Sequence, residues 1–475
     1  MNFENRLLIG NTWTETKERL TVKNPFNGEV ISEVCYGGKA EIDAAIAAAR
    51  QGFEAMRALP AYQRSEILKK TAEILSRDKE GFAELICREA GKPIIAARAE
   101  VDRSIITFML AAEEATRIIG EVLPLDISAA AGHRIGMTRR FPVGVVAAIT
   151  PFNFPLNLTA HKIAPALAAG NSVVHKPSSA TPLTALKLGR ALLSAGMPAG
   201  AVNVVPCSGS TADTLVTDDR IAMISFTGSP VVGWAMKGRA GRKKVALELG
   251  GNAAVVIEPD SDIEAAAARC AAGGYAYAGQ VCISLQRIYV QEKIYDAFKK
   301  RFVDKVKAMK TGDPFKADTV VGPLITPEAV SRVGARVKAA AAMGGKILIG
   351  GHANKNIYSP TVLENVPDHA ECVKDEIFGP VTVLFPYRDF ETAVDRVNDS
   401  VYGLQAGVFT RDLDKALMAF NRIETGGVII NDVPTFRVDN FPYGGIKHSG
   451  FGREGVKYAV EEMTEIKIMV MTDRL

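Results

Sequence analysis

A cysteine in an unusual local sequence is the strongest candidate for a reacting group in this chain. Cys282 follows Gly279-Gln280-Val281, among turn-forming and small polar residues, which is not the position expected of an inert thiol in a core stripe. A reactive cysteine is a partly exposed thiolate, and backbone N–H dipoles in such a turn can lower its pKa. For a lone cysteine, a structural thiol is the commoner explanation of the same residues.

Two carboxylates stand in turns where they could take part in the chemistry. Glu248 ends a predicted strand before Leu249-Gly250-Gly251, so its side chain could swing and act as a general base. Glu376 lies two residues before Phe378 and a Gly-Pro turn. A carboxylate can accept two hydrogen bonds from the vicinal hydroxyls of a ribose. The alternative explanation for Glu248 is a solvated loop glutamate. The alternative for Glu376 is a loop held in place by a buried phenylalanine.

Two further motifs directly follow predicted strands. Asn153 lies between two prolines in the segment 151–155, and α/β proteins bind ligands at the carboxyl edge of their sheets. The segment 226–229, Phe-Thr-Gly-Ser, passes from a strand through a glycine to a helix start, where backbone N–H groups suit a phosphate. A proline-rich turn capped by Asn153 and an ordinary strand-to-helix turn stay open as explanations.

Strands and helices alternate through the part of the chain that carries these motifs. In its first half, strands are expected at Val143–Ile149, Ser172–His175, Ala201–Val205, Met223–Phe226 and Lys244–Glu248, and helices near 160–169, 182–195, 211–217 and 231–239. A second alternating region, 252–447, has predicted strands near Ala253–Ile257, Ile288–Val290 and Val428–Asn431. This alternation predicts an α/β fold with a doubly wound, Rossmann-like sheet and a second α/β domain.

The N-terminal part and the tail have different patterns. The first forty residues indicate strands and turns, followed by helices from Glu41, after Pro60, and from near Ala99 to Ile119. The stretch 121–142 has β character with a turn at 129–132, which makes it a hairpin. The segment 461–470 is a strand-like tail, and a strand so near a terminus often pairs with a neighbouring subunit.

The composition excludes several classes of protein. The 475 residues are 47% hydrophobic and 23% charged, with a formal net charge of +4. No lysine and arginine block indicates nucleic-acid binding, and no apolar run approaches the about 18 residues of a membrane helix. The N-terminus lacks a signal-peptide pattern, so we expect a cytoplasmic protein. The six scattered cysteines form no CxxC pair, so neither a metal site nor a disulfide framework is expected.

Taken in order, the motifs resemble the NAD(P)-dependent aldehyde dehydrogenase superfamily from end to end. Eight segments carry the resemblance: Leu8-Ile9-Gly10, PFNFP at 151–155, Lys176-Pro177-Ser178, FTGS at 226–229, ELGG at 248–251, GQVC at 279–282, EIFGP at 376–380 and Pro442-Tyr443-Gly444-Gly445-Ile446-Lys447. The resemblance implies an enzyme that oxidises an aldehyde to the carboxylic acid, with hydride transfer to NAD or NADP.

Three residues match the family's catalytic positions. By resemblance, Cys282 attacks the aldehyde and forms a thiohemiacetal, which becomes a thioester after hydride transfer. The side-chain amide of Asn153 and the backbone N–H of Cys282 would hold the oxyanion. Glu248 would then act as the general base that activates water for hydrolysis.

The resemblance also implies a cofactor site. Lys176 would hold the adenosine ribose, and Glu376 the nicotinamide ribose. The other implied positions are Ile149, Thr150, Pro151, Phe152, Ser178, Ser179, Gly209, Phe226, Thr227, Gly228, Ser229, Val232, Leu249, Gly250 and Phe378, with Thr227, Gly228 and Ser229 at the pyrophosphate. Members restricted to NAD often carry a glutamate at the position of Ser179, which repels a 2′-phosphate. Ser179 therefore predicts that NADP is accepted.

A subgroup that this chain resembles takes small polar or anionic aldehydes, namely lactaldehyde, glyceraldehyde 3-phosphate, phosphonoacetaldehyde and semialdehydes. Arg103, His161 and Arg437 match its anion-binding positions, and a guanidinium suits a carboxylate or phosphate. A salt bridge at the surface or between domains would equally explain Arg103 and Arg437. Val281 stands where phosphate-specific members tend to carry arginine. We therefore expect a small hydroxyaldehyde or semialdehyde, with non-phosphorylating glyceraldehyde-3-phosphate oxidation as the alternative.

Rival functions differ in the residues they need. A CoA-acylating relative typically lacks the carboxylate of Glu248, and a thiol hydrolase would need neither Glu376 nor Lys176. A non-catalytic role is disfavoured by the joint presence of Cys282, Glu248 and Asn153.

The expected domains are an NAD(P)-binding domain at 1–120 and 143–250, a catalytic domain at 251–447, and an oligomerisation element at 121–142 and 448–475. Family members are usually dimers or tetramers, so a homodimer or homotetramer is expected.

Overall fold

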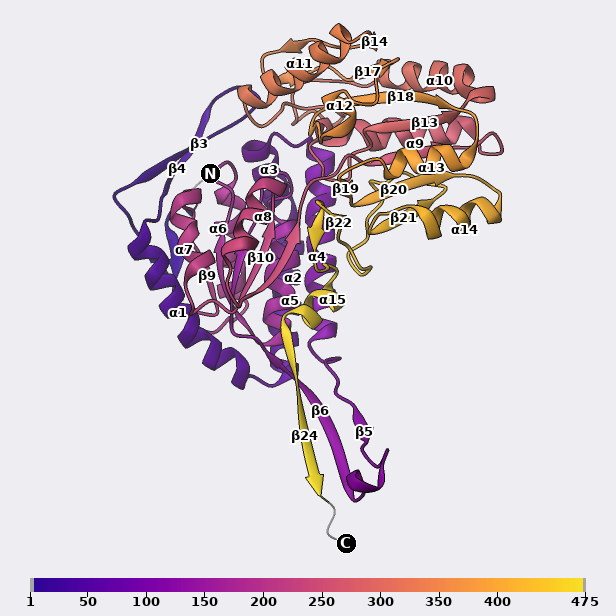
Figure 1. The fold of residues 1–475 in the computed structure, drawn as a ribbon. Helices are drawn as coiled ribbons and strands as arrows, with labels where there is room; N and C mark the ends of the chain where they lie inside the picture. Colours follow the sequence, from indigo (N-terminus) through magenta and orange to yellow (C-terminus); the bar gives the residue numbers. More distant parts are fainter. Residues whose placement is uncertain (1–3, 473–475) are drawn as a thin grey trace.

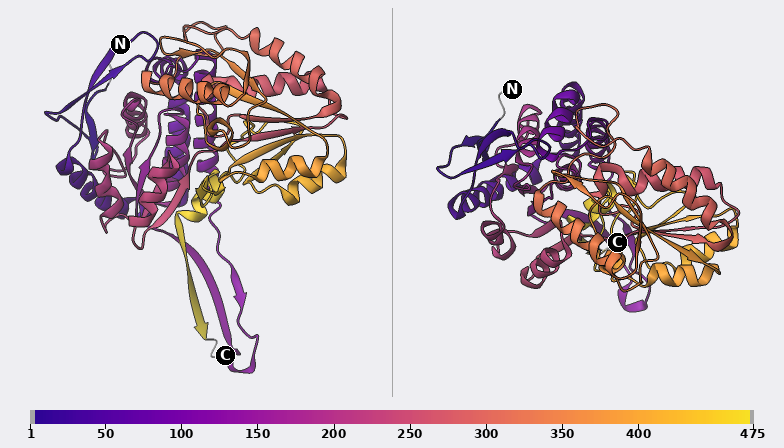
Figure 2. Two further views of the ribbon diagram at one scale, coloured as in Figure 1. Left: turned by 45° about the horizontal axis from the view of Figure 1, so that its top comes forward. Right: turned by 90° about the horizontal axis from the view of Figure 1, so that it is seen from above.

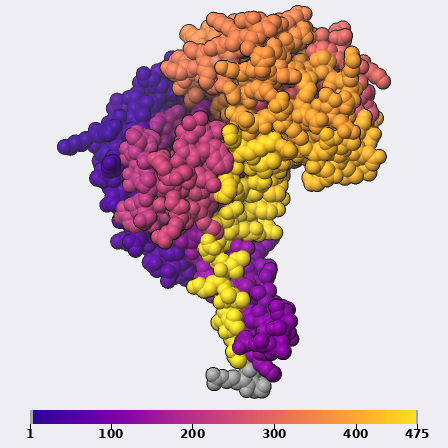
Figure 3. Space-filling view, viewed as in Figure 1, coloured from indigo at the N-terminus to yellow at the C-terminus, as the bar shows by residue number. Residues whose placement is uncertain are grey.

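The computed structural model describes residues 4–472 and consists of two α/β lobes with a long β arm (Figure 1). The predicted α/β class is confirmed. The lobes lie side by side, and the arm projects away from both of them (Figures 2 and 3). The outermost residues of the predicted domain ranges, 1–3 and 473–475, lie outside the described residues. No helix within 4–472 is long and apolar enough to cross a membrane.

The first lobe is built on a sheet with the strand order β2-β1-β9-β8-β7-β10-β11-β23. Its strands are β1 (Leu7–Ile9), β2 (Thr12–Thr14), β7 (Val145–Ile149), β8 (Ser172–Lys176), β9 (Val202–Val204), β10 (Met223–Thr227), β11 (Lys244–Glu248) and β23 (Gly450–Phe451). The five central strands, from β9 to β11, are parallel. The chain winds outward from β7 in one direction and from β10 in the other. The boundary between β7 and β10 is therefore a switch point, where open α/β sheets bind ligands beyond the carboxyl ends of the strands.

Helices cover both faces of this sheet, which explains its nearly continuous apolar strands. In β7, Val146 and Ala148 point into one core, whereas Val145, Ala147 and Ile149 point into the other. The first core is formed with α2 (Ala61–Arg77), α3 (Lys79–Ala90), α4 (Ile94–Glu114), α5 (Asn157–Ala169) and α6 (Pro182–Ser194), and the second with α1 (Lys39–Ala58), α7 (Gly209–Thr217) and α8 (Pro230–Arg239). A parallel strand that is buried on both faces shows no polar alternation.

The second lobe has its own sheet and its own core. The strand order is β14-β17-β18-β13-β12-β20-β21, and β14 is its antiparallel member. The strands are β12 (Ala254–Ile257), β13 (Arg287–Gln291), β14 (Lys346–Ile349), β17 (Thr361–Glu364), β18 (Val381–Tyr387), β20 (Gln405–Phe409) and β21 (Gly427–Ile430). The helices are α9 (Ile263–Tyr275), α10 (Tyr295–Lys307), α11 (Pro327–Ala342), α12 (Glu371–Lys374), α13 (Phe390–Asn398) and α14 (Leu413–Arg422). The core of this lobe is a separate apolar cluster, so the crevice between the lobes lies between two independently packed bodies.

The arm is a three-stranded antiparallel sheet of β5 (Val122–Pro124), β6 (Arg134–Pro142) and β24 (Thr464–Thr472). β24 pairs with the whole of β6, from Thr464 opposite Pro142 to Thr472 opposite Arg134. Side chains on both faces of β24 are exposed beyond its first residue. The remaining pairs are β3 (Arg19–Lys23) with β4 (Val30–Cys35), β15 (Ala353–Asn354) with β16 (Ile357–Tyr358), and β19 (Tyr402–Gly403) with β22 (Ile446–Lys447).

The structure corrects two expectations about the N-terminal helices, namely their number and the bounds of the last one. The N-terminal block contains four helices, not three: Asp78 separates α2 from α3, and α4 begins after Pro93 rather than near Ala99. α4 ends at Glu114 rather than Ile119, because the Thr116 hydroxyl donates to the carbonyl of Glu113 and competes with continued helix.

The segment 448–475, which we expected to form the oligomerisation element with 121–142, does not lie wholly in the arm. β23 pairs with β11 of the first lobe, and α15 (Val456–Glu462) packs against α4 and α5. Of the segment 448–475, only β24 belongs to the arm. A strand of two residues and a helix of two turns carry too weak a periodicity to be recognised in the sequence.

Candidate active site

A cavity of about 300 Å³ lies at the carboxyl edge of the first sheet, facing the second lobe. Its lining brings together residues that are far apart in the sequence: Pro151, Phe152, Asn153, Leu158, Thr227, Gly228, Ser229, Leu249, Gly250, Cys282, Arg332, Glu376 and Phe378. The first-lobe residues follow β7, β10 and β11, which are adjacent strands. The cavity is thus the switch point that the sheet order predicts.

Cys282 enters this cavity from a strained turn of the second lobe. Two residues of the turn after α9, Tyr277 and Ala278, have left-handed φ angles of 51° and 54°, and Gly279 follows with 68°. A Cβ at Gly279 would lie 2.2 Å from the carbonyl oxygen of Gly379, so this position requires glycine. Cys282 is partly exposed, whereas the other five cysteines are buried. The turn therefore presents a single thiol to the cavity.

The Cys282 sulfur has a protein partner that the sequence did not indicate. Its Sγ lies 3.0 Å from the hydroxyl of Tyr443. Burial raises the pKa of the Cys282 thiol to about 11, while the Tyr443 hydroxyl and the positive charge of Arg437 act in the opposite direction.

Asn153 faces the cysteine turn across the crevice. Its amide nitrogen donates to the carbonyl of Gln280 at 2.9 Å, which leaves the second N–H of the amide free for another acceptor. The loop that carries it is anchored by Glu100, whose carboxylate accepts from the backbone N–H groups of Leu156 and Asn157 at 2.9 and 3.1 Å. Asn153 is thereby held at the start of α5, close to the turn that carries Cys282.

A buried cation joins the two loops. Lys92 pairs with Glu100, and its ammonium lies 3.5 Å from the ring centre of Phe154 and 4.6 Å from that of Tyr277. Phe154 follows Asn153, and Tyr277 belongs to the cysteine turn. Since both partners are buried, removal of either one would leave the other as an uncompensated charge between the two loops.

Glu248 stands at the end of β11 and is 4% exposed. Within the described residues, its Oε2 atom is buried without a hydrogen-bond partner. Burial, followed by the negative charge of Glu454, raises the pKa of Glu248 well above its usual value. A carboxyl group in this setting exchanges a proton in a higher pH range than a solvated glutamate does, as a general base near neutral pH requires.

Glu376 approaches the backbone of the first lobe closely. Its carboxylate accepts from the N–H of Gly251 at 3.2 Å, and a Cβ on Gly250 would lie 2.2 Å from its other oxygen. Burial raises the pKa of Glu376 to about 7. Phe378, with a φ of 49°, packs edge-on against Phe152 with 6.0 Å between ring centres. Glycine at 250 thus lets a second-lobe carboxylate reach the first-lobe wall.

The other predicted cofactor positions lie along the same sheet edge. Ile149 pairs in register with Lys176 on β8 and with Phe226 on β10, and Thr150 follows Ile149. Ser178 and Ser179 follow β8, Gly209 begins α7 after β9, and Val232 lies in the first turn of α8. None of these eight is among the residues that line the 300 Å³ cavity. The Ser179 hydroxyl lies 3.0 Å from that of Tyr36, a contact between residues 143 positions apart that no local pattern indicates.

The three predicted anion-binding residues lie in a buried charge cluster. Asp439 accepts from Arg103, with a shortest distance of 2.6 Å, and from Nε2 of His161 at 2.8 Å. Glu454 pairs with Arg437 at 3.2 Å and with Lys162 at 2.7 Å. The salt-bridge alternative for both arginines is therefore present. Three cations face two carboxylates, which leaves one positive charge.

His161 contributes a lone pair rather than a charge to this cluster. Burial, then the positive charge of Arg437, lowers the pKa of His161, so the ring is neutral at pH 7. Since Nε2 donates to Asp439, the neutral ring leaves Nδ1 as an acceptor, and among residues 4–472 this atom has no partner. His161 is thus better suited to a hydroxyl group than to an anion.

Sequence reasoning missed several residues of the site. Arg332 and Leu158 line the cavity, and Tyr443 and Tyr36 contact predicted site residues. Arg332 lies in the amphipathic helix α11, where an arginine is expected at any exposed position. Tyr443 belongs to the motif at 442–447, but nothing in the spacing of that motif indicated a contact with Cys282.

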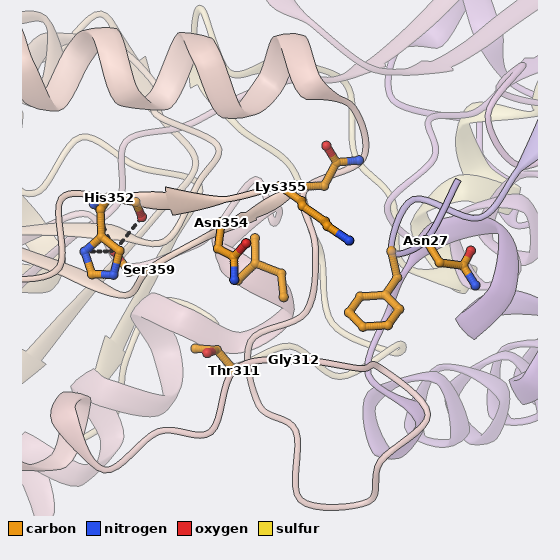
Figure 4. A pocket seen from close by; sticks show the side chains of 10 residues that line it. Asn27, Thr311, Gly312, His352, Asn354, Lys355 and Ser359 are labelled. Carbon is orange, nitrogen blue, oxygen red and sulfur yellow. Dashed lines mark hydrogen bonds between the residues drawn. The ribbon is translucent and has the colours of Figure 1, made fainter. Parts of the chain in front are cut away.

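A second cavity, of about 490 Å³, shares no lining residue with the first and lies between the turn before β4 and the β15–β16 hairpin (Figure 4). Its ionisable lining side chains are His352 and Lys355, and the Ser359 hydroxyl donates to the backbone carbonyl of His352 at 2.8 Å. The Ser359 hydroxyl also lies 3.5 Å from Nδ1 of His352, but its proton is donated to the carbonyl rather than to the ring, and both side chains are at the exposed hairpin. The smaller cavity is therefore the better candidate for catalysis.

Comparisons with known proteins identify the family to which the chain is similar. The aldehyde dehydrogenase family description matches residues 13–469. The chain is 42% identical over 466 residues to a 3-sulfolactaldehyde dehydrogenase of Priestia aryabhattai, covering 98% of this chain and 97% of that protein.

Two solved structures are similar over nearly the whole chain. Aldehyde dehydrogenase 21 of Physcomitrella patens, in complex with the reaction product succinate, has a TM-score of 0.97 at 46% identity, covering 99% of this chain and 98% of that one. The glyceraldehyde-3-phosphate dehydrogenase GapN of Methanocaldococcus jannaschii, complexed with NADP, has a TM-score of 0.93 at 42% identity, covering 96% and 100%.

Proposed function

The chain belongs to the aldehyde dehydrogenase family and is an NAD(P)-dependent aldehyde dehydrogenase, and from this we propose that Cys282, Asn153 and Glu248 carry its chemistry on a small anionic aldehyde. The observation that supports the assignment most strongly is the convergence of three separate segments at the switch point of the first sheet. A partly exposed thiol and a carboxamide with a free N–H line the cavity there, and the buried carboxylate of Glu248 ends β11 directly before the lining residues Leu249 and Gly250.

The first step is attack of the Cys282 thiolate on the aldehyde carbon. The new C–S bond places the carbonyl electron pair on oxygen, which becomes the oxyanion of a thiohemiacetal. The free N–H of Asn153 and the backbone N–H of Cys282 are the donors for this charge. Fixed donors in a site that excludes water are worth far more than donors in solution, because they need no reorganisation as the charge develops.

The residues at the sheet edge fit a dinucleotide. Within the described chain, the Thr227 hydroxyl is buried without a partner, and Ser229 makes no side-chain cap on α8. The first-turn N–H groups of this ten-residue helix are therefore available to a pyrophosphate. The Glu376 carboxylate has capacity for ribose hydroxyls. NAD(P)⁺, when bound, accepts the hydride that the aldehyde carbon loses.

Glu248 completes the reaction by activating water. The thioester left on Cys282 is hydrolysed when a water loses a proton to the Glu248 carboxylate and attacks the acyl carbon. The C–S bond then breaks, its electron pair returns to the sulfur, and the carboxylic acid leaves. The presence of this carboxylate favours hydrolysis over acyl transfer to CoA.

Replacement of the proposed nucleophile tests the assignment. Cys282→Ser should lower aldehyde oxidation by at least about a thousandfold, because a hydroxyl lacks the thiolate's nucleophilicity at neutral pH. Cys207→Ser, at a buried thiol, is the matched control and should keep most of the activity. Aldehyde oxidation that survives in Cys282→Ser would overturn the proposal. Acid formed without reduction of NAD(P)⁺ would favour a hydrolase, and a product that requires CoA would favour an acyl transferase.

The charge cluster supports a small anionic or hydroxylated aldehyde as the substrate. One positive charge remains after its ion pairs are counted. Among residues 4–472, the Nε of Arg437 and the Nδ1 of His161 are buried without partners. An arginine donor suits a carboxylate, sulfonate or phosphate, and an imidazole acceptor suits a hydroxyl. The sulfolactaldehyde named for one similar protein carries a sulfonate and a hydroxyl, and the succinate named for another carries carboxylates.

NADP is proposed to be accepted as well as NAD. Ser179 and Tyr36 present two hydroxyls near the end of β8, and neither carries a charge that would repel a 2′-phosphate. Lys176, at the end of the same strand, adds a positive charge. The NADP in the similar GapN structure is consistent with this proposal.

The arm is proposed to join this chain to further copies of itself. Ile466, Ile468 and Val470 of β24 are 60%, 49% and 51% exposed, and β24 is an edge strand. An open edge with apolar side chains on it is unstable in isolation and is normally covered. A homodimer or homotetramer would cover it. We also propose a cytoplasmic location, where a reducing environment keeps a reactive thiol free.

A further inference from the structure

The Cys282 sulfur is in contact with a phenol that has no part in the reaction described above. Tyr443 lies in the loop between β21 and β22, and its hydroxyl is 3.0 Å from Sγ of Cys282. The side chain is 2% exposed. Because burial raises the pKa of Tyr443 well above its usual value, the hydroxyl keeps its proton and can only donate when the sulfur is a thiolate.

Arg437 lies behind the ring of Tyr443. Its guanidinium carbon is 3.6 Å from the ring centre, and Glu454 holds the guanidinium from the other side at 3.2 Å. A cation over the face of a phenol draws electron density from the ring, which makes the O–H group a stronger donor. The backbone fixes the same arrangement, because Tyr443 and Glu454 exchange N–H to carbonyl hydrogen bonds of 2.9 and 2.6 Å.

We propose that Tyr443 is a further catalytic residue of this enzyme, whose hydroxyl donates a hydrogen bond to the Cys282 thiolate, and that Arg437 is its positioning residue. The proposal rests on the proposed role of Cys282. The hydrogen bond acts twice. It stabilises the thiolate before attack, and it stabilises the same sulfur when the C–S bond of the thioester breaks and the electron pair returns to it.

The remaining charges around the sulfur make this donor necessary. Glu248 approaches from the end of β11 and Glu376 from the loop before β18, and a negative charge on either disfavours a thiolate. Arg437 favours the thiolate, but Glu454 partly neutralises it. Lys162 also pairs with Glu454 and is not among the charges that act most strongly on the Cys282 thiol. Tyr443 is thus the group that offers the sulfur a hydrogen bond without adding a charge.

The test is the rate at which iodoacetamide alkylates Cys282 as a function of pH, read at the Cys282 peptide by mass spectrometry on the full chain. Tyr443→Phe keeps the ring beneath Arg437 and removes only the hydroxyl. It should move the alkylation profile upward by about one pH unit, equivalent to about a tenfold loss of thiolate at a given lower pH. The kcat/KM for aldehyde should fall about tenfold at neutral pH and recover at alkaline pH.

Tyr387→Phe is the matched control. It removes a buried hydroxyl that contacts the Glu258 carboxylate and lies 3.0 Å from the carbonyl of Ile257, neither of which lines the cavity, and it should leave the alkylation profile unchanged. An unchanged profile in Tyr443→Phe, or an activity loss equal at every pH, would overturn the inference. Failure of the proposed function is separable, because it would appear as aldehyde oxidation that survives Cys282→Ser.

Discussion

The two walls of the active-site cavity are built in different ways. The first-lobe wall consists of the residues that follow β7, β10 and β11, three neighbouring parallel strands whose register places them side by side. The opposite wall consists of loops with left-handed residues, such as Tyr277 and Phe378, backed by buried ion pairs. The first wall is fixed by the sheet, with one buried pair of Lys92 and Glu100 behind the Asn153 loop, and the second wall depends on long-range charge pairs.

This difference predicts where mutations should have large effects. On the first wall, a substitution removes a local contact and leaves the sheet register in place. On the second wall, removal of one partner of a buried pair leaves a charge without compensation, which costs about 3–5 kcal/mol in a dry interior. Function should therefore be tunable at the first wall and fragile at the second.

Glu248 should show the largest effect. It ends β11, next to the first wall, and the negative charge of Glu454, which belongs to the ion pairs of the second wall, also acts on it. Glu248→Gln removes the base but keeps the size and hydrogen bonding, so kcat should fall by about 10²–10⁴-fold. Since the pKa of Glu248 is raised, hydrolysis in the wild type should increase with pH beyond the usual carboxylate range. The variant should lose this dependence and accumulate acyl-enzyme, which mass spectrometry of the intact chain measures. Full turnover in the variant would assign the base elsewhere.

Asp439 should give the next largest effect, on stability. Asp439→Asn leaves the charge of Arg103 without its anion, and because Arg103 is 27% exposed we expect a loss of about 2 kcal/mol, measured by urea unfolding. Asp432→Asn, which breaks the exposed pair with Arg269, should cost less than about 1 kcal/mol. Equal losses of unfolding free energy in the two variants would show that the pair of the second wall contributes no more than an exposed pair.

The same substitution has a defined pH dependence. Burial opposes ionisation of Asp439, but His161 and Arg103 outweigh it, and its pKa lies below the usual value. A carboxyl group with a depressed pKa contributes stability above its unfolded pKa of about 4 and loses it as the pH falls. The difference between wild type and Asp439→Asn should thus be constant near pH 7 and shrink below about pH 4. A difference that grows on acidification would contradict this assignment.

Arg437 should separate substrates by charge. Arg437→Ala should raise the KM for succinic semialdehyde about tenfold more than the KM for propanal, because only the former offers an anion to the guanidinium. Its effect through Tyr443 should lower kcat for both aldehydes alike. Arg388→Ala, at a side chain that is 88% exposed, is the control. If both KM values rise equally, Arg437 is not an anion site.

The contrast between the walls also explains what the sequence could predict. The first-wall residues follow apolar strands, so Asn153, Thr227 and Glu248 could be placed at one sheet edge from the strand pattern. The resemblance supplied Cys282 and Glu376, whose local sequences alone left structural explanations open. The carbonyl that forces glycine at 279 comes from residue 379, a hundred residues away.

The contacts of the second wall could not be predicted because they join distant positions. Asp439 and Arg103 are 336 residues apart, and Tyr443 and Cys282 are 161 apart. No local periodicity encodes such pairs. The predicted role of His161 illustrates the consequence. The resemblance implied that it helps bind an anion, whereas its burial makes the ring neutral and its contact with Asp439 leaves Nδ1 as an acceptor.

Ser179 should show the smallest effect, because it tests the first wall at its open edge. Ser179→Glu places a carboxylate beside the position proposed for the 2′-phosphate, and solvent screening limits the repulsion to about tenfold in kcat/KM for NADP. The kcat/KM for NAD should change less than about twofold, because NAD has no charge at that position. Ser179→Ala, which removes the hydroxyl bonded to Tyr36 without adding charge, separates repulsion from the lost hydrogen bond. A strong NAD preference in the wild type that Ser179→Glu leaves unchanged would refute the assignment. A fall in stability as large as that of Asp439→Asn would instead show that the first wall depends on its side chains as much as the second does.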